Sequence, residues 1–239
     1  MTVRSGKYIG IDQWVPFAVL DAGMSGFLEK GFVDKDEIRK HLREFTQGEN
    51  RASKAARVAV NILSRPEEIL NICKKELTNA AYLRLLESER KALLTSLLAC
   101  TYPIFYDLLI AMAIAFKVQP QINKQFINQK MSKLYGSNRS FDIALDSLII
   151  MIVELDIVKR VKRSLYSQSE IKTLHTPCIC EAYIYADIKM SGSKTVLLED
   201  IDTRPWFIYN KVEYKAQKHT HLLKFSEGRI GGGYIGIRA

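Results

Sequence analysis

A long, almost uncharged segment in the middle of the chain limits the folds that this sequence can adopt. From Ala92 to Phe116, only Asp107 is charged at neutral pH. A membrane-spanning helix needs about 20 consecutive apolar residues, and Pro103 and Asp107 divide this run into shorter pieces. Proline interrupts a helix, and an aspartate near the bilayer centre costs on the order of 3 kcal/mol. We therefore expect two buried helices that meet at residues 101–103, and no membrane span.

The composition is that of a globular protein that needs no disulfide or metal to fold. Of the 239 residues, 47% are hydrophobic and 26% are charged, which excludes disordered and collagen-like classes. Four cysteines are ordinary usage, and the first residues lack the continuous apolar stretch of a secretion signal. These features indicate a cytoplasmic location.

Capping signals and amphipathic periods predict helices throughout residues 1–100. Asp34 followed by Glu37 is typical of a helix N-terminus, and Pro66 is typical of a first helical turn. Further helices are expected over residues 51–63, 76–87 and 88–100.

Residues 101–168 show the order of elements that is found in a winged helix-turn-helix. The order is helix, helix, glycine-containing turn, helix and basic strand-forming segment, with the second helix ending at Gly136 and the third at Asp156. Asn138 or Ser140 is expected to cap the third helix. A winged helix carries a basic hairpin, the wing, beside the helices that meet the nucleic acid.

The positive charge of the chain concentrates in this middle part. The formal net charge is +9, and residues 117–163 hold nine basic against four acidic residues. A basic surplus favours anionic partners, and a helix N-terminus and a basic wing both bind phosphates. Ten residues are therefore predicted to face double-stranded DNA: Lys124, Lys130, Lys133, Asn138, Arg139, Ser140, Lys159, Arg160, Lys162 and Arg163.

A second basic group lies in the predicted helix 51–63. Arg51, Lys54 and Arg57 follow each other at helical spacing and are a further candidate DNA contact. The alternative is a solvated helix face, which such charge groups often form.

The predicted third helix of the winged unit is poorly suited to enter a major groove. It carries Asp142 and Asp146, and no basic residue follows Arg139 before its end. We therefore expect contact with the DNA backbone and little base readout. Winged helices also bind proteins, so an interaction scaffold without DNA binding is the alternative function.

No metal site, cofactor site or catalytic site is predicted. His175, Cys178 and Cys180 form H-x-x-C-x-C, with His219 and His221 further on, a poor match to zinc ligands. We expect a strand whose alternate cysteines face the core. Gly231, Gly233 and Gly236 spell G-x-G-x-x-G, but the chain ends before the helix that a dinucleotide site requires.

Residues 169–239 favour strands. The segments 171–190, 194–201 and 206–214 are rich in β-branched and aromatic residues, and the glycine-rich end is expected to be a loop. Asp187 and Lys189 resemble the acidic-x-Lys element of metal-dependent nucleases, a less favoured third function. An exposed strand is the simpler interpretation. The aromatic residues of this part could stack bases or fill a core: Tyr183, Tyr185, Trp206, Phe207, Tyr209 and Tyr214.

Three stretches within residues 49–158 show a family resemblance in residue type. They are ENRASKAARVAVNIL, ERKALLTSLLACTYPIFYDLL and IIMIVELDIV. This part of the chain resembles the BrxA-type accessory proteins of bacterial BREX phage-defence systems. The resemblance implies a mostly helical, cytoplasmic, non-enzymatic DNA-binding protein that acts beside a methyltransferase and other defence components. Residues 170–239 form an extension outside the family's pattern.

The sequence thus predicts a mainly α protein in three parts: a helical domain over 1–100, a winged-helix-like domain over 101–168, and a small α+β extension over 169–239. The predicted function is non-enzymatic binding of double-stranded DNA within a defence or regulatory assembly.

Overall fold

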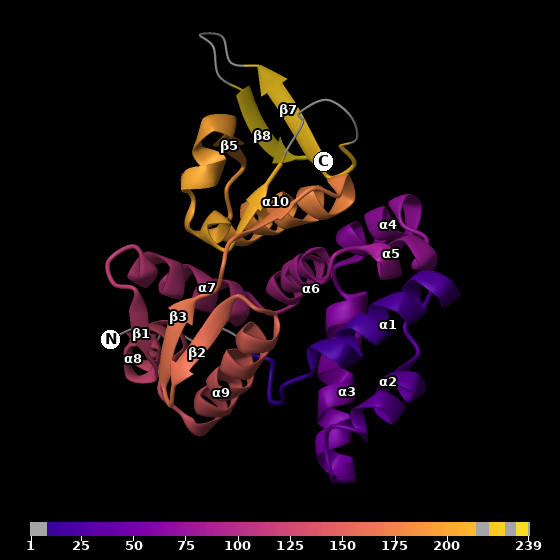
Figure 1. The fold of residues 1–239 in the computed structure, drawn as a ribbon, viewed down its shortest axis with the longest axis vertical. Coiled ribbons are helices and arrows are strands. Elements are labelled where there is room, and N and C mark those ends of the chain that lie inside the picture. Colours follow the sequence, from indigo (N-terminus) through magenta and orange to yellow (C-terminus); the bar gives the residue numbers. More distant parts are fainter. Residues whose placement is uncertain (1–8, 214–219, 228–232, 239) are drawn as a thin grey trace, which may run out of the picture.

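A computed structural model describes residues 9–213, 220–227 and 233–238. The chain is mostly helical, with a small strand-containing C-terminal part, as the sequence predicts. The N-terminal helices lie at one side of the molecule, the middle elements at the other, and the C-terminal part lies above both in Figure 1. One continuous hydrophobic core includes residues from all three parts.

The N-terminal part consists of consecutive helices, two of which begin at a capping side chain. They are α1 (Phe17–Lys30), α2 (Lys35–Leu42), α3 (Glu49–Ser64), α4 (Glu67–Glu76) and α5 (Asn79–Arg84). The predicted cap at Asp34 is confirmed, because its carboxylate accepts from the amides of Asp36 and Glu37, each at 3.1 Å. The predicted helix over 76–87 is wrong in length: Leu77 is extended and the Thr78 hydroxyl caps a new, shorter helix.

The apolar middle segment forms two helices, as predicted. These are α6 (Glu87–Thr101) and α7 (Pro103–Phe116), which meet at Tyr102 with a bend of 116°. Within the described ranges, no single helix is long and apolar enough to cross a membrane, and α6 and α7 meet that test only as a bent pair.

The next elements are a short strand, two helices and two further strands. They are β1 (Gln121–Asn123), α8 (Lys124–Tyr135), α9 (Arg139–Glu154), β2 (Val158–Lys162) and β3 (Leu165–Gln168). The three strands form an antiparallel sheet in the order β1-β3-β2, with Tyr166 paired to Ile122 on one side and Arg160 on the other. Asn138 is the N-cap of α9, since its Oδ1 accepts from the Phe141 amide at 2.9 Å.

A long helix replaces the first predicted C-terminal strand. Residues 171–190 were expected to be strand, but Pro177–Ser191 is the helix α10, which packs along α6. Because α10 is buried on nearly all sides, it lacks the apolar stripe that reveals a surface helix. Its ends carry ordinary helix signals, Pro177 in the first turn and Gly192 in the left-handed conformation after the last.

Short strands and 3-10 helices complete the C-terminal part. β4 (Lys172–Leu174) pairs in parallel with β6 (Asn210–Val212), and β5 (Thr195–Leu197), β8 (Gly233–Ile237) and β7 (Leu223–Glu227) form an antiparallel sheet in that spatial order. The 3-10 helices η1 (Leu198–Thr203) and η2 (Pro205–Ile208) occupy stretches that were predicted to be strand.

The predicted loop at the glycine-rich end is wrong for Gly233–Ile237, which is β8. Glycine is needed here for close packing, because a Cβ on Gly236 would lie 2.8 Å from the Lys194 carbonyl oxygen. Gly231 lies outside the described residues.

A carboxylate of α6 fixes the start of α10. Glu89 is only 4% exposed, and its oxygens accept from the amides of His175 and Thr176, each at 2.8 Å, and from the Thr176 hydroxyl at 2.7 Å. Amides before the first turn of a helix have no intrahelical partner. Glu89 therefore supplies, from 86 residues away, the acceptor that α10 needs.

We predict that Glu89→Ala lowers the free energy of unfolding by about 3 kcal/mol, because buried donors lose a charged acceptor. Glu89→Gln keeps one acceptor oxygen and should cost about 1 kcal/mol. Urea unfolding followed by circular dichroism measures both. A Glu89→Ala variant as stable as the parent protein would show that this contact does not hold α10 in place.

Candidate nucleic-acid interface

The β2–β3 hairpin carries a dense cluster of positive charge. Lys159, Arg160, Lys162 and Arg163 are all exposed, and none forms an ion pair with another residue that the structure describes. The register shifts between Arg160 and Lys162, and Ser164 at the turn has a φ of +62°. A bulge increases strand twist and redirects side chains. The hairpin therefore presents four exposed cations to solvent, of which Lys159 also interacts with the charge of the Glu170 carboxylate.

The first turn of α8 lies against the tip of this hairpin. The Lys124 amide donates to the Ser164 carbonyl oxygen at 2.8 Å, and Asn123 caps the helix by accepting from the Phe126 amide at 2.7 Å. The Lys124 ammonium is not free for a ligand, because it pairs with Asp146 of α9 at 2.5 Å. The structure thus places a helix N-terminus beside the basic hairpin, while the charge of one predicted contact residue is compensated.

The other predicted DNA-contact residues of the middle part differ in whether their side chains are free to bind a ligand. Asn138 is already engaged as the cap of α9. The Lys130 ammonium lies 5.4 Å from the centre of the Phe126 ring. The Lys130 side chain is nevertheless exposed to solvent. The remaining predicted positions of α8 and α9 are exposed: Lys133, Arg139 and Ser140.

The outer face of α9 is acidic and apolar. Asp142 and Asp146 are exposed on this face, and Ile143 and Ile150 are 42% and 41% exposed. Carboxylates repel phosphates, and two isoleucines offer no hydrogen bond to the edge of a base. This surface is therefore unsuited to reading bases in a major groove.

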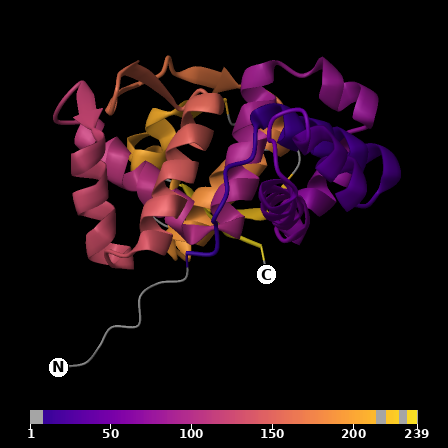
Figure 2. The same cartoon turned by 90° about the horizontal axis from the view of Figure 1, so that it is seen from below.

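The basic group on α3 is separate from the hairpin. Arg51, Lys54 and Arg57 are exposed, and Arg57 pairs with Asp12 at 2.7 Å. In Figure 1, α3 lies at the lower right and β2–β3 at the lower left, and Figure 2 also separates them. The structure does not bring the two predicted groups into one surface.

The histidine and cysteine group belongs to the start of α10. Cys178 and Cys180 lie in a buried helix, not on the expected strand, and burial raises the pKa of both thiols to about 12. His175 and His221 each bond to a glutamate at 3.0 Å, and His219 lies outside the described residues. In the described part of the chain, no group of three or more potential ligands is placed to hold a metal ion.

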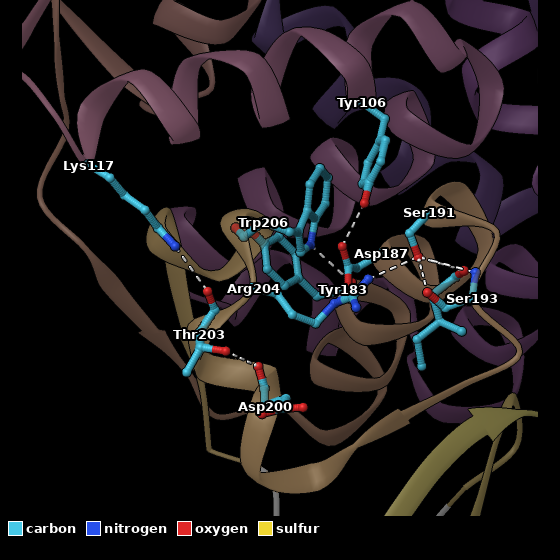
Figure 3. A network of polar contacts seen from close by, with 11 residues as sticks. Tyr106, Lys117, Tyr183, Asp187, Ser191, Ser193, Asp200, Thr203, Arg204 and Trp206 are labelled. Atoms are coloured by element: carbon cyan, nitrogen blue, oxygen red, sulfur yellow. Dashed lines mark hydrogen bonds and ion pairs between the residues drawn. The ribbon is translucent and has the colours of Figure 1, made fainter.

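Asp187 lies inside the molecule, not on an exposed strand. One of its oxygens accepts from the Tyr106 hydroxyl at 2.8 Å, and the other is paired with Nε of Arg204 (Figure 3). Lys189 turns away to Glu68 of α4, at 2.8 Å. Both oxygens that a nuclease would offer to a metal are therefore engaged within the protein.

Sequence reasoning missed Arg204, because no spacing connects it with Asp187. The useful signal was a helical interpretation of 177–191, which places Asp187 and Ser191 four residues apart on one face. Arg204 binds both side chains, with Nη2 donating to the Ser191 hydroxyl at 2.9 Å.

Most of the aromatic side chains of this part fill the core. Tyr183 and Trp206 have ring centres 4.9 Å apart, and Tyr106 packs on the other side of Trp206 at 5.3 Å. Phe207 and Tyr209 are buried as well. These rings are not available for stacking, and Tyr214 lies outside the described residues.

Comparison with models of protein families, with curated proteins and with solved structures finds no match to this chain.

We predict that the cysteines of the native protein react very slowly with a thiol reagent. Burial raises the pKa of Cys100, Cys178 and Cys180 to about 12, and that of Cys73 well above its usual range. The reactive thiolate is then at most about 10⁻⁴ of each group at a pH of about 8. A colorimetric thiol assay should detect four cysteines only after unfolding in guanidinium. Rapid reaction of Cys178 or Cys180 before unfolding would contradict the burial of α10.

Proposed function

We propose that residues 101–168 form a winged helix that binds double-stranded DNA through its phosphate backbone, without acting as an enzyme. The order α7, β1, α8, α9, β2, β3 and the sheet order β1-β3-β2 support this proposal. In helix-turn-helix proteins, the second helix of the motif faces the duplex, and α9 holds that position here. The β2–β3 hairpin corresponds to the wing.

The exposed positive charge of the β2–β3 hairpin carries the proposal. Lys159, Arg160, Lys162 and Arg163 are exposed and form no close ion pair with a described residue, and Glu170 is near enough to Lys159 for a charge interaction. The α8 N-terminus lies at the hairpin tip. Basic side chains that neutralise phosphates release condensed counterions from DNA. At the α8 N-terminus the amides of Lys124 and Phe126 are already bonded within the protein, so phosphate oxygens would be bound there by the other first-turn amides.

Because the outer face of α9 is acidic, we expect the protein to bind DNA with little preference for base sequence. Asp142 and Asp146 keep this helix from close approach to base edges, so the hairpin and the helix ends would make the contacts. Such binding depends steeply on salt and weakly on base sequence.

The biological setting follows from the resemblance of residues 49–158 to BrxA-type proteins. That resemblance supports a cytoplasmic accessory role in a phage-defence or regulatory assembly, with other protein components as partners and without a cofactor or a membrane. Arg51, Lys54 and Arg57 would then be a separate basic surface, available to the same DNA or to a partner.

A protein-interaction scaffold is the second candidate function. The observation that favours it is the pair of exposed isoleucines on α9, Ile143 and Ile150, which share a face with Asp142 and Asp146. Exposed apolar side chains rimmed by polar ones are typical of protein contacts.

We predict that replacing Lys159, Arg160, Lys162 and Arg163 together by Ala weakens duplex binding and flattens its salt dependence. The slope of log K against log[salt] should fall in magnitude by about 3 to 4, since each phosphate contact contributes about 0.9. Fluorescence anisotropy with a labelled duplex at several salt concentrations measures the slope.

The matched control removes four exposed cations from α2, α4 and α5: Lys35, Lys40, Lys75 and Arg84. This variant has the same net charge as the hairpin variant and should keep the parent slope. Equal losses in both variants would mean that total charge, not the hairpin, drives binding. Absence of duplex binding by the parent protein at about 50 mM salt would exclude the DNA function.

We further predict that Asp146→Asn binds duplex DNA roughly three- to tenfold more tightly at low salt. The change removes a carboxylate near the duplex and frees Lys124, which is paired with Asp146 at 2.5 Å. Glu29→Gln on α1 removes a distant exposed charge and is the control. If Asp146→Asn and Glu29→Gln bind alike, α9 does not face DNA, and the scaffold function gains support.

A further inference from the structure

A pocket in the C-terminal part lies apart from the basic hairpin. Its volume is about 550 Å³, and its walls come from β5, η1, η2 and β8. The pocket is largely open to solvent, so a bound ligand would be only partly covered by protein. The side chains that matter for recognition are Asp200, Arg204, Pro205 and Tyr234.

The structure holds the Arg204 guanidinium in one orientation. Its Nε pairs with the buried carboxylate of Asp187, and its Nη2 donates to the Ser191 hydroxyl at 2.9 Å (Figure 3). Asp187 is itself fixed by the Tyr106 hydroxyl at 2.8 Å. Guanidinium carries five N–H donors, so donors remain for a ligand after these two contacts.

The Asp187–Arg204 pair links the interior of the molecule to the pocket. The Asp187 side chain is 2% exposed, and that of Arg204 is 22% exposed. Because Arg204 lines the pocket, the pair holds a guanidinium group at the pocket wall.

Tyr234 gives the pocket an aromatic surface. The residue lies on β8 opposite Leu197 of β5, is 40% exposed, and stacks on no aromatic ring among the described residues. Stacking of a base on an aromatic side chain contributes about 1–3 kcal/mol. Pro205 adds a second apolar surface to the same pocket.

The charges of the pocket favour an uncharged ligand with both donors and acceptors. Asp187 compensates the charge of Arg204, which leaves the exposed carboxylate of Asp200 as the net charge of the wall. A phosphate inside the pocket would be repelled by Asp200. A planar ligand would match these residues if acceptors on one edge bound the Arg204 guanidinium and donors on the neighbouring edge bound the Asp200 carboxylate.

We propose that this pocket binds a guanine base. Guanine presents the acceptors O6 and N7 on one edge and an N–H donor on its neighbouring side, and its ring would stack on Tyr234. The base could come from a free guanine nucleoside or from single-stranded nucleic acid. This site is independent of the proposed duplex contact of the hairpin.

Isothermal titration calorimetry of the full chain with guanosine, adenosine and cytidine tests the proposal. Guanosine should bind most tightly, and Tyr234→Ala should weaken it at least about tenfold. Tyr234→Phe keeps the ring and is the matched control, with expected affinity close to that of the parent. Asp200→Asn should reduce the preference for guanosine over adenosine. Circular dichroism establishes that each exposed-site variant is folded.

A short dT oligonucleotide with one central dG, compared with the same strand without dG, separates the two sources of the base. Tighter binding of the dG strand than of guanosine, with the same loss in Tyr234→Ala, identifies single-stranded nucleic acid. Equal binding identifies a free nucleoside. The proposal is overturned if neither guanosine nor the dG strand binds, or if Tyr234→Ala binds them as the parent does.

Discussion

Buried and half-buried glutamates that accept hydrogen bonds from distant backbone amides connect the parts of this molecule. Glu89 caps the start of α10, Glu154 of α9 accepts from the first amide of α1 at 2.7 Å, and Glu181 of α10 accepts from two amides at the start of β7 at 2.6 and 3.0 Å. A buried amide without an acceptor costs about 1–3 kcal/mol. These contacts therefore determine which segments can pack together, beyond what apolar burial alone specifies.

The central helix α10 connects the two proposed ligand surfaces. Its residue Asp187 orients Arg204 in the C-terminal pocket and also binds Tyr106 of α7, the helix that leads into the basic middle part. Lys117 at the end of α7 donates to the Thr203 carbonyl oxygen at 3.2 Å. The pocket and the hairpin thus belong to one packed framework, although they lie on different elements and would meet different ligands.

Features that depend on neighbouring residues could be predicted from the sequence, and those that depend on distant contacts could not. The cap at Asp34, the break at Pro103 and the exposed cations of 159–163 each follow from a few adjacent residues. Residues 177–191 have strand-forming side chains and no apolar period, because α10 is buried all round, so tertiary packing decides its structure. The Lys124–Asp146 and Asp187–Arg204 ion pairs could be identified only from the three-dimensional structure.

The proposed function requires that the β2–β3 hairpin and the adjacent helix N-termini meet the DNA backbone. Hydrogen–deuterium exchange of the full chain, with and without duplex DNA at low salt, tests this claim most directly. We expect slower exchange on DNA binding over residues 158–168 and in the first turns of α8 and α9, and unchanged exchange along the rest of α9. Slower exchange that is confined to α3, or to the part of α9 after its first turn, with no change in the hairpin, would contradict the proposed function.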